Sequence, residues 1–159
     1  MISDLEDIIR NIDRVLIIGV GSLFRRDDYA GIYICEKLKK NHEIDSLIVE
    51  NSIENYIGKI NKLNPEIILI IDAVNFHREP GYFELTSVFS IFDNTAGTHS
   101  LSLKKLAGLI KTDEIYVLGI QPGDISFGTG LSQPVLKSAK RIILKFEELN
   151  SKKTKLTTP

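Results

Sequence analysis

Residues 67–73 read Ile-Ile-Leu-Ile-Ile-Asp-Ala, the most apolar stretch of the chain. A continuous run of branched aliphatic side chains is typical of a central parallel strand that is covered on both faces. Val15–Ile18 has the same character, so the sequence predicts two strands of this kind. Both runs are far shorter than the roughly 20 apolar residues that a membrane-spanning helix needs. We therefore expect no association with a membrane.

Strand-like and amphipathic segments alternate on either side of these two runs, which is typical of an α/β layer architecture. The other predicted strands are Leu47–Val49, Tyr82–Leu85 and Ile115–Ile120. Two predicted helices begin at Ser3 and at Ser52. The other three cover Asp28–Lys40, Leu101–Ile110 and Pro134 to about Leu149. We expect residues 1–150 to form a single α/β domain and the polar residues 151–159 to form a disordered tail.

Composition and charge narrow the class of protein. The 159 residues suffice for one domain with a real core, and the formal net charge of −1 gives no overall field that would hold nucleic acid. The single cysteine, Cys35, indicates a reducing compartment and lies on the apolar side of a predicted helix, so we expect it in the core rather than as a nucleophile. The acidic stretch Ser3–Asp7 is unlike the basic start of a signal peptide. These features favour a cytoplasmic protein.

Three ionisable positions fall where a parallel α/β sheet binds its ligands, beyond the carboxyl ends of its strands. Asp27 and Asp28 close the loop after the first predicted strand, Asp72 directly follows the third, and His99 precedes a predicted helix. A strand-end carboxylate such as Asp72 needs a hydrogen-bond donor, a cation or water to offset its lost hydration. Two carboxylates and one imidazole at the same edge of the sheet have the donor atoms of a divalent-metal site.

Each of these residues also has an ordinary structural explanation. An aspartate near a helix start, such as Asp28, is common in any protein, and Asp72 is open to a capping role in a turn. A lone histidine such as His99 is more often structural or exposed than functional. His42 ends a predicted helix and His77 lies in a polar loop, so we expect both to face solvent.

Two other functional classes use similar sequence features. Residues 19–21 (Gly-Val-Gly) begin like a dinucleotide-binding fingerprint, but Phe24 occupies the position of its third glycine. A phosphate-accepting receiver domain is the stronger alternative, since it also has an acidic pair after its first strand and a phosphorylated aspartate, here Asp72, after its third. The long loop before Asp27 and the absence of lysine from residues 119–122 (Gly-Ile-Gln-Pro) disfavour it.

Four motifs resemble those of the hydrogenase maturation endopeptidases, in the same order and with similar spacing. Residues 19–28 (GVGSLFRRDD) resemble the family's G-x-G-N-x-L-x-x-D-D/E opening, and residues 70–74 (IIDAV) with Pro80-Gly81 resemble its strand-end aspartate motif. Residues 98–101 (THSL) resemble its histidine turn. Residues 118–122 (LGIQP) with 131–134 (LSQP) resemble the closing segment of the HycI-type branch. The resemblance extends from about Val15 to Leu149.

The resemblance implies a three-layer α/β/α fold whose five-stranded twisted sheet is mostly parallel, with one antiparallel edge strand. It also implies an aspartic-type endopeptidase that removes the C-terminal extension of a nickel-iron hydrogenase large-subunit precursor after nickel insertion. In that family Asp28, Asp72 and His99 would be the catalytic residues and would recognise the nickel that the precursor carries. We expect no permanent metal in the resting enzyme, and a monomer. A nickel- or precursor-binding chaperone without protease activity is the non-enzymatic alternative.

Several positions expected to contact the substrate depart from the family pattern. The expected substrate-binding residues are Gly21, Ser22, Asp27, Glu50 and Gln121. Ser22 stands where the family has asparagine, Tyr29 where it has glycine, and residues 50–52 (Glu-Asn-Ser) where it has D-G-G or D-G-T. Glu50 either replaces the family's aspartate or is a surface acid at a strand end. Because the three ligands are retained, these departures concern the choice of precursor more than the reaction.

Overall fold

The computed structural model describes residues 4–41, 44–50, 52–91 and 107–156. Within these residues, five strands form one sheet in the order β2-β1-β3-β5-β4. The strands are β1 (Val15–Val20), β2 (Ser46–Val49), β3 (Ile67–Ala73), β4 (Phe83–Ser87) and β5 (Ile115–Ile120). β1 pairs in parallel with β2 and β3, and β3 with β5, whereas β4 pairs antiparallel with β5 at the edge. The predicted fold class is confirmed.

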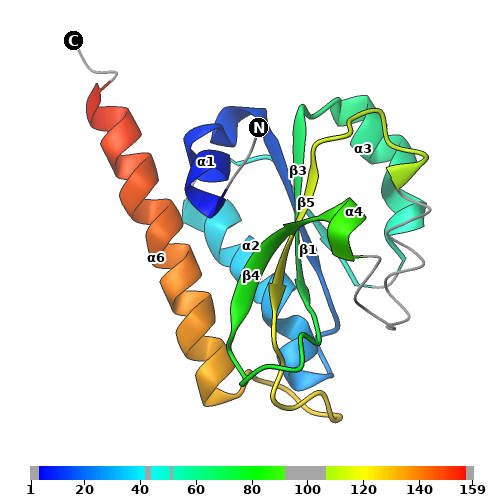
Figure 1. The fold of residues 1–159 in the computed structure, drawn as a ribbon, viewed down its shortest axis with the longest axis vertical. Helices are drawn as coiled ribbons and strands as arrows, with labels where there is room; N and C mark the ends of the chain where they lie inside the picture. The colour runs from blue at the N-terminus through cyan, green and yellow to red at the C-terminus, as the bar shows by residue number, and fades with distance from the viewer. Residues whose placement is uncertain (1–3, 42–43, 51, 92–106, 157–159) are drawn as a thin grey trace.

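Helices cover both faces of the sheet. They are α1 (Leu5–Arg10), η1 (Ile12–Arg14), η2 (Arg26–Tyr29), α2 (Ala30–Asn41), η3 (Ile53–Tyr56), α3 (Ile57–Leu63), α4 (Val88–Ile91) and α6 (Gln133–Leu156). In Figure 1 the sheet is seen nearly edge-on, with α1, α2 and α6 on one side and α3 and α4 on the other. The molecule therefore has three layers.

Two apolar clusters lie between these layers, and β3 contributes to both. Leu69 and Ile71 pack with the α6 residue Phe146 in one cluster, whereas Ile68 and Ile70 pack with the α3 residue Ile60 in the other. Successive side chains of a strand point to opposite faces, so a strand covered on both faces must be apolar throughout. This explains the unbroken aliphatic run.

The last helix is longer than the sequence predicted. α6 continues through residues 151–156, so these residues are helical and the predicted disordered tail is wrong for them. Lys153 forms an ion pair with Asp13, and the hydroxyl of Ser151 donates to the carbonyl of Glu147 at 2.8 Å. These contacts, together with the high helix propensity of lysine, extend the helix beyond the body of the sheet. Residues 157–159 lie outside the described residues.

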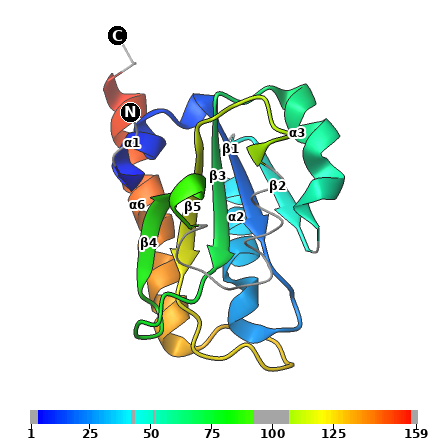
Figure 2. The same cartoon turned by 45° about the vertical axis from the view of Figure 1, so that its right-hand side comes forward.

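The path of the chain creates a switch point between β1 and β3. After β1 the chain crosses over through α2 to β2 on one side of β1, and then returns through α3 to β3 on the other side. The loops after β1 and β3 consequently diverge, which leaves room for a site at the carboxyl ends of these two strands. Figure 2 shows β1, β3 and β5 running toward the same end of the molecule. No helix in the described part of the chain has the length and apolar character required to cross a membrane.

Candidate active site at the carboxyl end of the sheet

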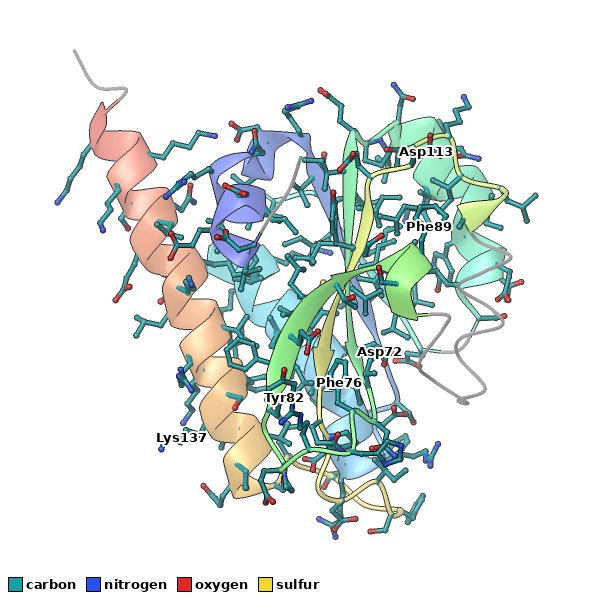
Figure 3. The ribbon with its side chains drawn as sticks, in the orientation of Figure 1. Asp72, Phe76, Tyr82, Phe89, Asp113 and Lys137 are labelled. Atoms are coloured by element: carbon teal, nitrogen blue, oxygen red, sulfur yellow. The ribbon has the colours of Figure 1, made fainter. Side chains whose placement is uncertain are left out.

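Asp72 lies near the carboxyl end of β3, opposite Gly119 of β5. Its side chain is buried, at 4% relative exposure, and its Oδ1 accepts a hydrogen bond from the backbone N–H of Ala73 at 2.8 Å. Burial raises the pKa of the Asp72 carboxyl well above its ordinary value, and the negative charge of Asp28 raises it further. Asp28 therefore lies close enough to Asp72 for its charge to disfavour ionisation of the Asp72 carboxyl. In Figure 3, Asp72 is well separated from Asp113, which lies at the other end of the sheet.

The backbone around Asp28 is fixed by the glycine-containing loop that follows β1. Asp28 is half-buried in η2; its N–H donates to the carbonyl of Arg25 at 3.0 Å, and its own carbonyl accepts from the N–H of Ser22 at 3.2 Å. A Cβ at Gly21, where φ is +154°, would lie 1.8 Å from the Asp28 carbonyl oxygen. Gly21 is therefore required by this close approach, which indicates how it serves the site.

Gly31 brings η2 and the start of α2 against the end of β3. A Cβ at this position would lie 2.0 Å from the carbonyl oxygen of Ile71 and 2.6 Å from that of Val20. Ile71 immediately precedes Asp72, so the close packing at Gly31 draws Asp28 toward Asp72. Sequence reasoning missed Gly31, although a glycine within a predicted helix was a usable signal for close packing.

The carboxylate of Asp27 points into the protein. It is fully buried, and its oxygens accept hydrogen bonds from the N–H groups of Gly123, Asp124 and Ser132 and from the Ser132 hydroxyl, at 2.7–2.9 Å. The donors all belong to the segment between β5 and α6. The two adjacent aspartates thus have different surroundings: Asp27 is enclosed by hydrogen-bond donors, and Asp28 lies beside Asp72.

Gln121, another predicted substrate contact, also bonds within the protein. Its Oε1 accepts from the N–H groups of Phe76 at 2.7 Å and Arg78 at 3.3 Å, and its Nε2 donates to Oδ1 of Asn75 at 3.2 Å. The side chain is largely buried. These bonds attach the loop after β3 to the end of β5 and shape the edge of the site next to Asp72.

Glu50 and Ser52 follow β2 and line a surface hollow of about 310 Å³ together with Ile48, Asn55 and Tyr56. Glu50 is exposed and Ser22 is half-buried. The hydroxyl of Tyr29 donates to Glu36 at 2.5 Å, and the pKa of Tyr29 is raised to about 12 by burial, by that hydrogen bond and by nearby charges that include Glu50. Two departures from the family pattern, Tyr29 and Glu50, therefore interact through charge.

Two of the three histidines, His42 and His99, lie outside the described residues, so the structure places neither of them. His77 is exposed, as predicted. Cys35 is fully buried in the core, and burial raises the pKa of its thiol, which confirms that it is a core residue. Among the residues that the structure describes, no group of three or more histidine, cysteine, aspartate or glutamate side chains is placed to hold a metal ion.

Fold and site together define a small α/β protein with a pair of acids at the switch point of its sheet, where one acid is buried and favours its protonated form. A family model described as hydrogenase maturation protease matches residues 32–148. The chain belongs to the hydrogenase maturation protease family. This membership leaves the receiver-domain alternative without support.

Individual relatives agree with this assignment. The hydrogenase 3 maturation protease of Escherichia coli K12 is 27% identical over 139 residues, which cover 83% of this chain and 88% of that protein. The crystal structure of the hydrogenase maturation protease HycI from Thermococcus kodakarensis superposes with a TM-score of 0.73 at 26% identity, covering 91% of this chain and 97% of that one. The endopeptidase HybD from E. coli has a TM-score of 0.70 at 21% identity, covering 87% and 93%, and shares the fold.

Proposed function

We propose that this protein is the endopeptidase that removes the C-terminal extension of a nickel-iron hydrogenase large-subunit precursor after nickel insertion. In this proposal Asp28, Asp72 and His99 recognise the nickel ion that the precursor carries. The ion belongs to the substrate, and the resting enzyme holds no permanent metal. The reaction takes place in the cytoplasm, on a monomeric enzyme.

The observation that supports this proposal is the burial of the Asp72 carboxyl at the end of β3, where the charge of the nearby Asp28 raises its pKa further. Two carboxylates in such surroundings repel each other and are poorly hydrated, so Asp72 favours its protonated form. A divalent cation placed beside both would reverse this preference, because it stabilises both ionised carboxylates. An empty precursor offers no such cation, and this difference makes nickel insertion a condition for productive docking.

The same pair of acids suits hydrolysis of a peptide bond. Once the nickel-bearing segment is docked, an ionised carboxylate at this site can accept a proton from the attacking water. Docking through the ion also holds the scissile peptide in a fixed position, which removes much of the entropic cost of the reaction. The classification as an aspartic-type peptidase follows from this proposed role of the two aspartates.

Cleavage of the purified precursor in vitro tests the proposal. We expect the wild-type enzyme to cut the nickel-loaded precursor and leave the metal-free precursor intact, as followed by the change in precursor mass. Asp28→Asn, Asp72→Asn and His99→Ala should each reduce cleavage by at least about 100-fold while the protein remains folded. Asp113→Asn, at an exposed position at the opposite end of the sheet, is the matched control and should cleave normally.

Each alternative result would contradict a different part of the proposal. Equal cleavage of loaded and empty precursor would remove the role of nickel. Normal cleavage by the Asp72 variant would remove the proposed site. Nickel-dependent binding of the precursor without any cleavage would indicate the non-proteolytic chaperone instead.

Metal analysis of the purified enzyme tests the proposed absence of a permanent metal. Three nitrogen and oxygen ligands form a weak site when no further protein ligand completes it. We therefore expect substoichiometric nickel and zinc by elemental analysis after gel filtration. Nickel at one ion per chain in the resting enzyme would contradict the proposal.

A further inference from the structure

Two loops at the carboxyl end of the sheet are bound to each other, although they are far apart in the sequence. We call residues 21–29 the acidic loop and residues 121–132 the closing loop. Backbone hydrogen bonds connect them: the N–H of Gly128 donates to the carbonyl of Phe24 at 2.9 Å, and the N–H of Arg26 donates to the carbonyl of Gly128 at 3.3 Å. The guanidinium of Arg26 adds an ion pair to the closing loop.

Asp27 is the buried centre of this contact. Its carboxylate accepts the four hydrogen bonds from Gly123, Asp124 and Ser132, and its backbone N–H donates to the carbonyl of Asp124 at 3.0 Å. Oδ2 accepts three of these bonds and Oδ1 accepts one, and the side chain is fully buried. A substrate therefore could not reach the Asp27 carboxylate without displacing the bonds that keep its buried charge solvated.

The next residue, Asp28, is held from two directions. On one side its carbonyl accepts from the N–H of Ser22 and packs against Gly21. On the other side it is joined through the peptide bond to Asp27, which the closing loop fixes in place. The two aspartates belong to the same short helical turn, η2, so a rotation of that turn would move Asp28 relative to Asp72.

We propose that Asp27 is a positioning residue: its buried carboxylate fixes the closing loop to the acidic loop and thereby sets the position of Asp28 beside Asp72. This role replaces the substrate contact expected for Asp27 from the sequence, and it rests on the proposed function of Asp28. It also explains why two adjacent aspartates serve one site, since one carboxylate organises the loops and the other faces the substrate.

Asp27→Asn tests the proposal. The amide NH2 of asparagine is a donor, and it would face the N–H and O–H donors of the closing loop that now bond to the carboxylate. Because donors cannot bond to donors, we expect the two loops to separate and Asp28 to shift. We expect kcat for the nickel-loaded precursor to fall about 10- to 100-fold, since a displacement of about 1 Å at a reacting group has an effect of this size, while KM changes little. Rates are taken per folded molecule, with the folded fraction measured by circular dichroism.

Ser126→Ala is the matched control. Among the described residues, the hydroxyl and the N–H of Ser126 both donate to Oδ1 of Asp124 within the closing loop, at 2.6 and 2.9 Å, and neither bonds to Asp27. The substitution removes the hydroxyl bond and keeps the backbone one. It should leave both kinetic constants unchanged. Ser132→Ala removes one of the four bonds to Asp27 and should lower kcat by a smaller factor. This second variant keeps the test informative if Asp27→Asn does not fold.

Three results would overturn the proposal. An increase in KM with kcat unchanged would show that Asp27 contacts the substrate. A loss of thermal stability with unchanged kcat per folded molecule would show a purely structural role. In 15N-labelled enzyme without substrate, Asp27→Asn should shift the amide signals of Asp28 and Ser22, whereas Ser126→Ala should not; unshifted signals would also contradict the proposal. This last measurement needs no activity, so it distinguishes failure of the positioning role from failure of the proposed function.

Discussion

At the scale of single residues, the site is built at the expense of stability. Asp72 occupies a buried strand position where an apolar side chain would pack more favourably, and its N–H partner comes from the adjacent residue. Its charge is further disfavoured by Asp28. Groups with such strongly altered pKa values are typical of functional sites, because a purely structural role would select a neutral side chain.

Asp72→Asn is predicted to stabilise the protein in a pH-dependent way. The folded state keeps the Asp72 proton up to a higher pH than the unfolded state does, so the wild type loses stability as pH rises from about 4 toward the raised pKa of Asp72. Asparagine cannot ionise and avoids this loss. The free energy of unfolding of the variant, measured with denaturant from pH 4 to pH 8, should match the wild type at the acidic end and exceed it at the neutral end.

A difference that is independent of pH, or a less stable variant at neutral pH, would contradict this prediction. Asp113→Asn again serves as control and should change stability by less than about 0.5 kcal/mol at every pH, as expected at an exposed position.

The sequence points to Asp28 and Asp72 as candidate site residues because both acids follow strands of the parallel sheet, whose carboxyl ends share one edge. It could not separate the role of Asp27 from that of Asp28. The donors to Asp27 are at positions 123, 124 and 132, about a hundred residues away in the chain, and no local pattern links them to it. The role of Gln121 was hidden for the same reason.

At the scale of secondary-structure elements, the packing of α2 on β1 and β3 sets the separation between Asp28 and Asp72. Gly31→Ala should push the start of α2 away from the end of β3, because its Cβ would overlap a backbone oxygen that cannot rotate aside. We expect a loss of about 1–3 kcal/mol in the free energy of unfolding and a lower cleavage rate. Chemical denaturation and the cleavage assay measure the two effects.

Gly58→Ala is the matched control for this prediction. Gly58 lies in α3, and in the described part of the chain no atom beyond its neighbours and its own helix backbone lies within 4 Å of the point that an alanine methyl group would occupy. Alanine there should stabilise the protein by about 0.4–1 kcal/mol and leave cleavage unchanged. If the two variants had equal effects, close packing at Gly31 would not be what positions the site.

Most elements could be predicted from periodicity and from Gly and Pro signals, but their ends could not. The first helix begins after Asp4, whose side chain accepts from the N–H of Asp7 at 2.9 Å, rather than at Ser3. The predicted helix from Asp28 is instead a turn of 3-10 helix followed by α2 from Ala30. The hydrogen bonds of the acidic loop, which the sequence does not reveal, impose this tighter turn. The predicted helix Leu101–Ile110 lies mostly outside the described residues.

At the scale of the whole molecule, the reactivity of the single cysteine measures how often the protein unfolds. Cys35 is buried between α2 and the sheet, its Sγ lies 3.6 Å from the carbonyl oxygen of Leu47, and burial raises the pKa of its thiol. We expect an aromatic disulfide reagent to modify the native protein only as fast as it unfolds, and the denatured protein at once with one thiol per chain. Rapid labelling under native conditions would contradict the buried placement.

The layer architecture followed from the sequence because each strand and helix carries its own apolar pattern. The order of strands did not follow from that pattern, since pairing between distant segments leaves little trace in a single sequence; the resemblance to a family supplied the antiparallel edge strand. The sequence did not predict that α6 extends past the sheet, because residues 151–156 are polar. Their helical state depends on continuity with the preceding turns and on the contact between Lys153 and Asp13.

The length of α6 separates its C-terminal end from the candidate site. The helix begins next to the closing loop and runs to the opposite end of the molecule (Figure 1), and its 24 residues correspond to about 36 Å. A fluorescent label or affinity tag joined beyond Leu156 is therefore kept by this helix at a distance from the candidate site. Immobilisation through that end would leave the candidate site directed into solution, an orientation suited to surface-based measurements of docking.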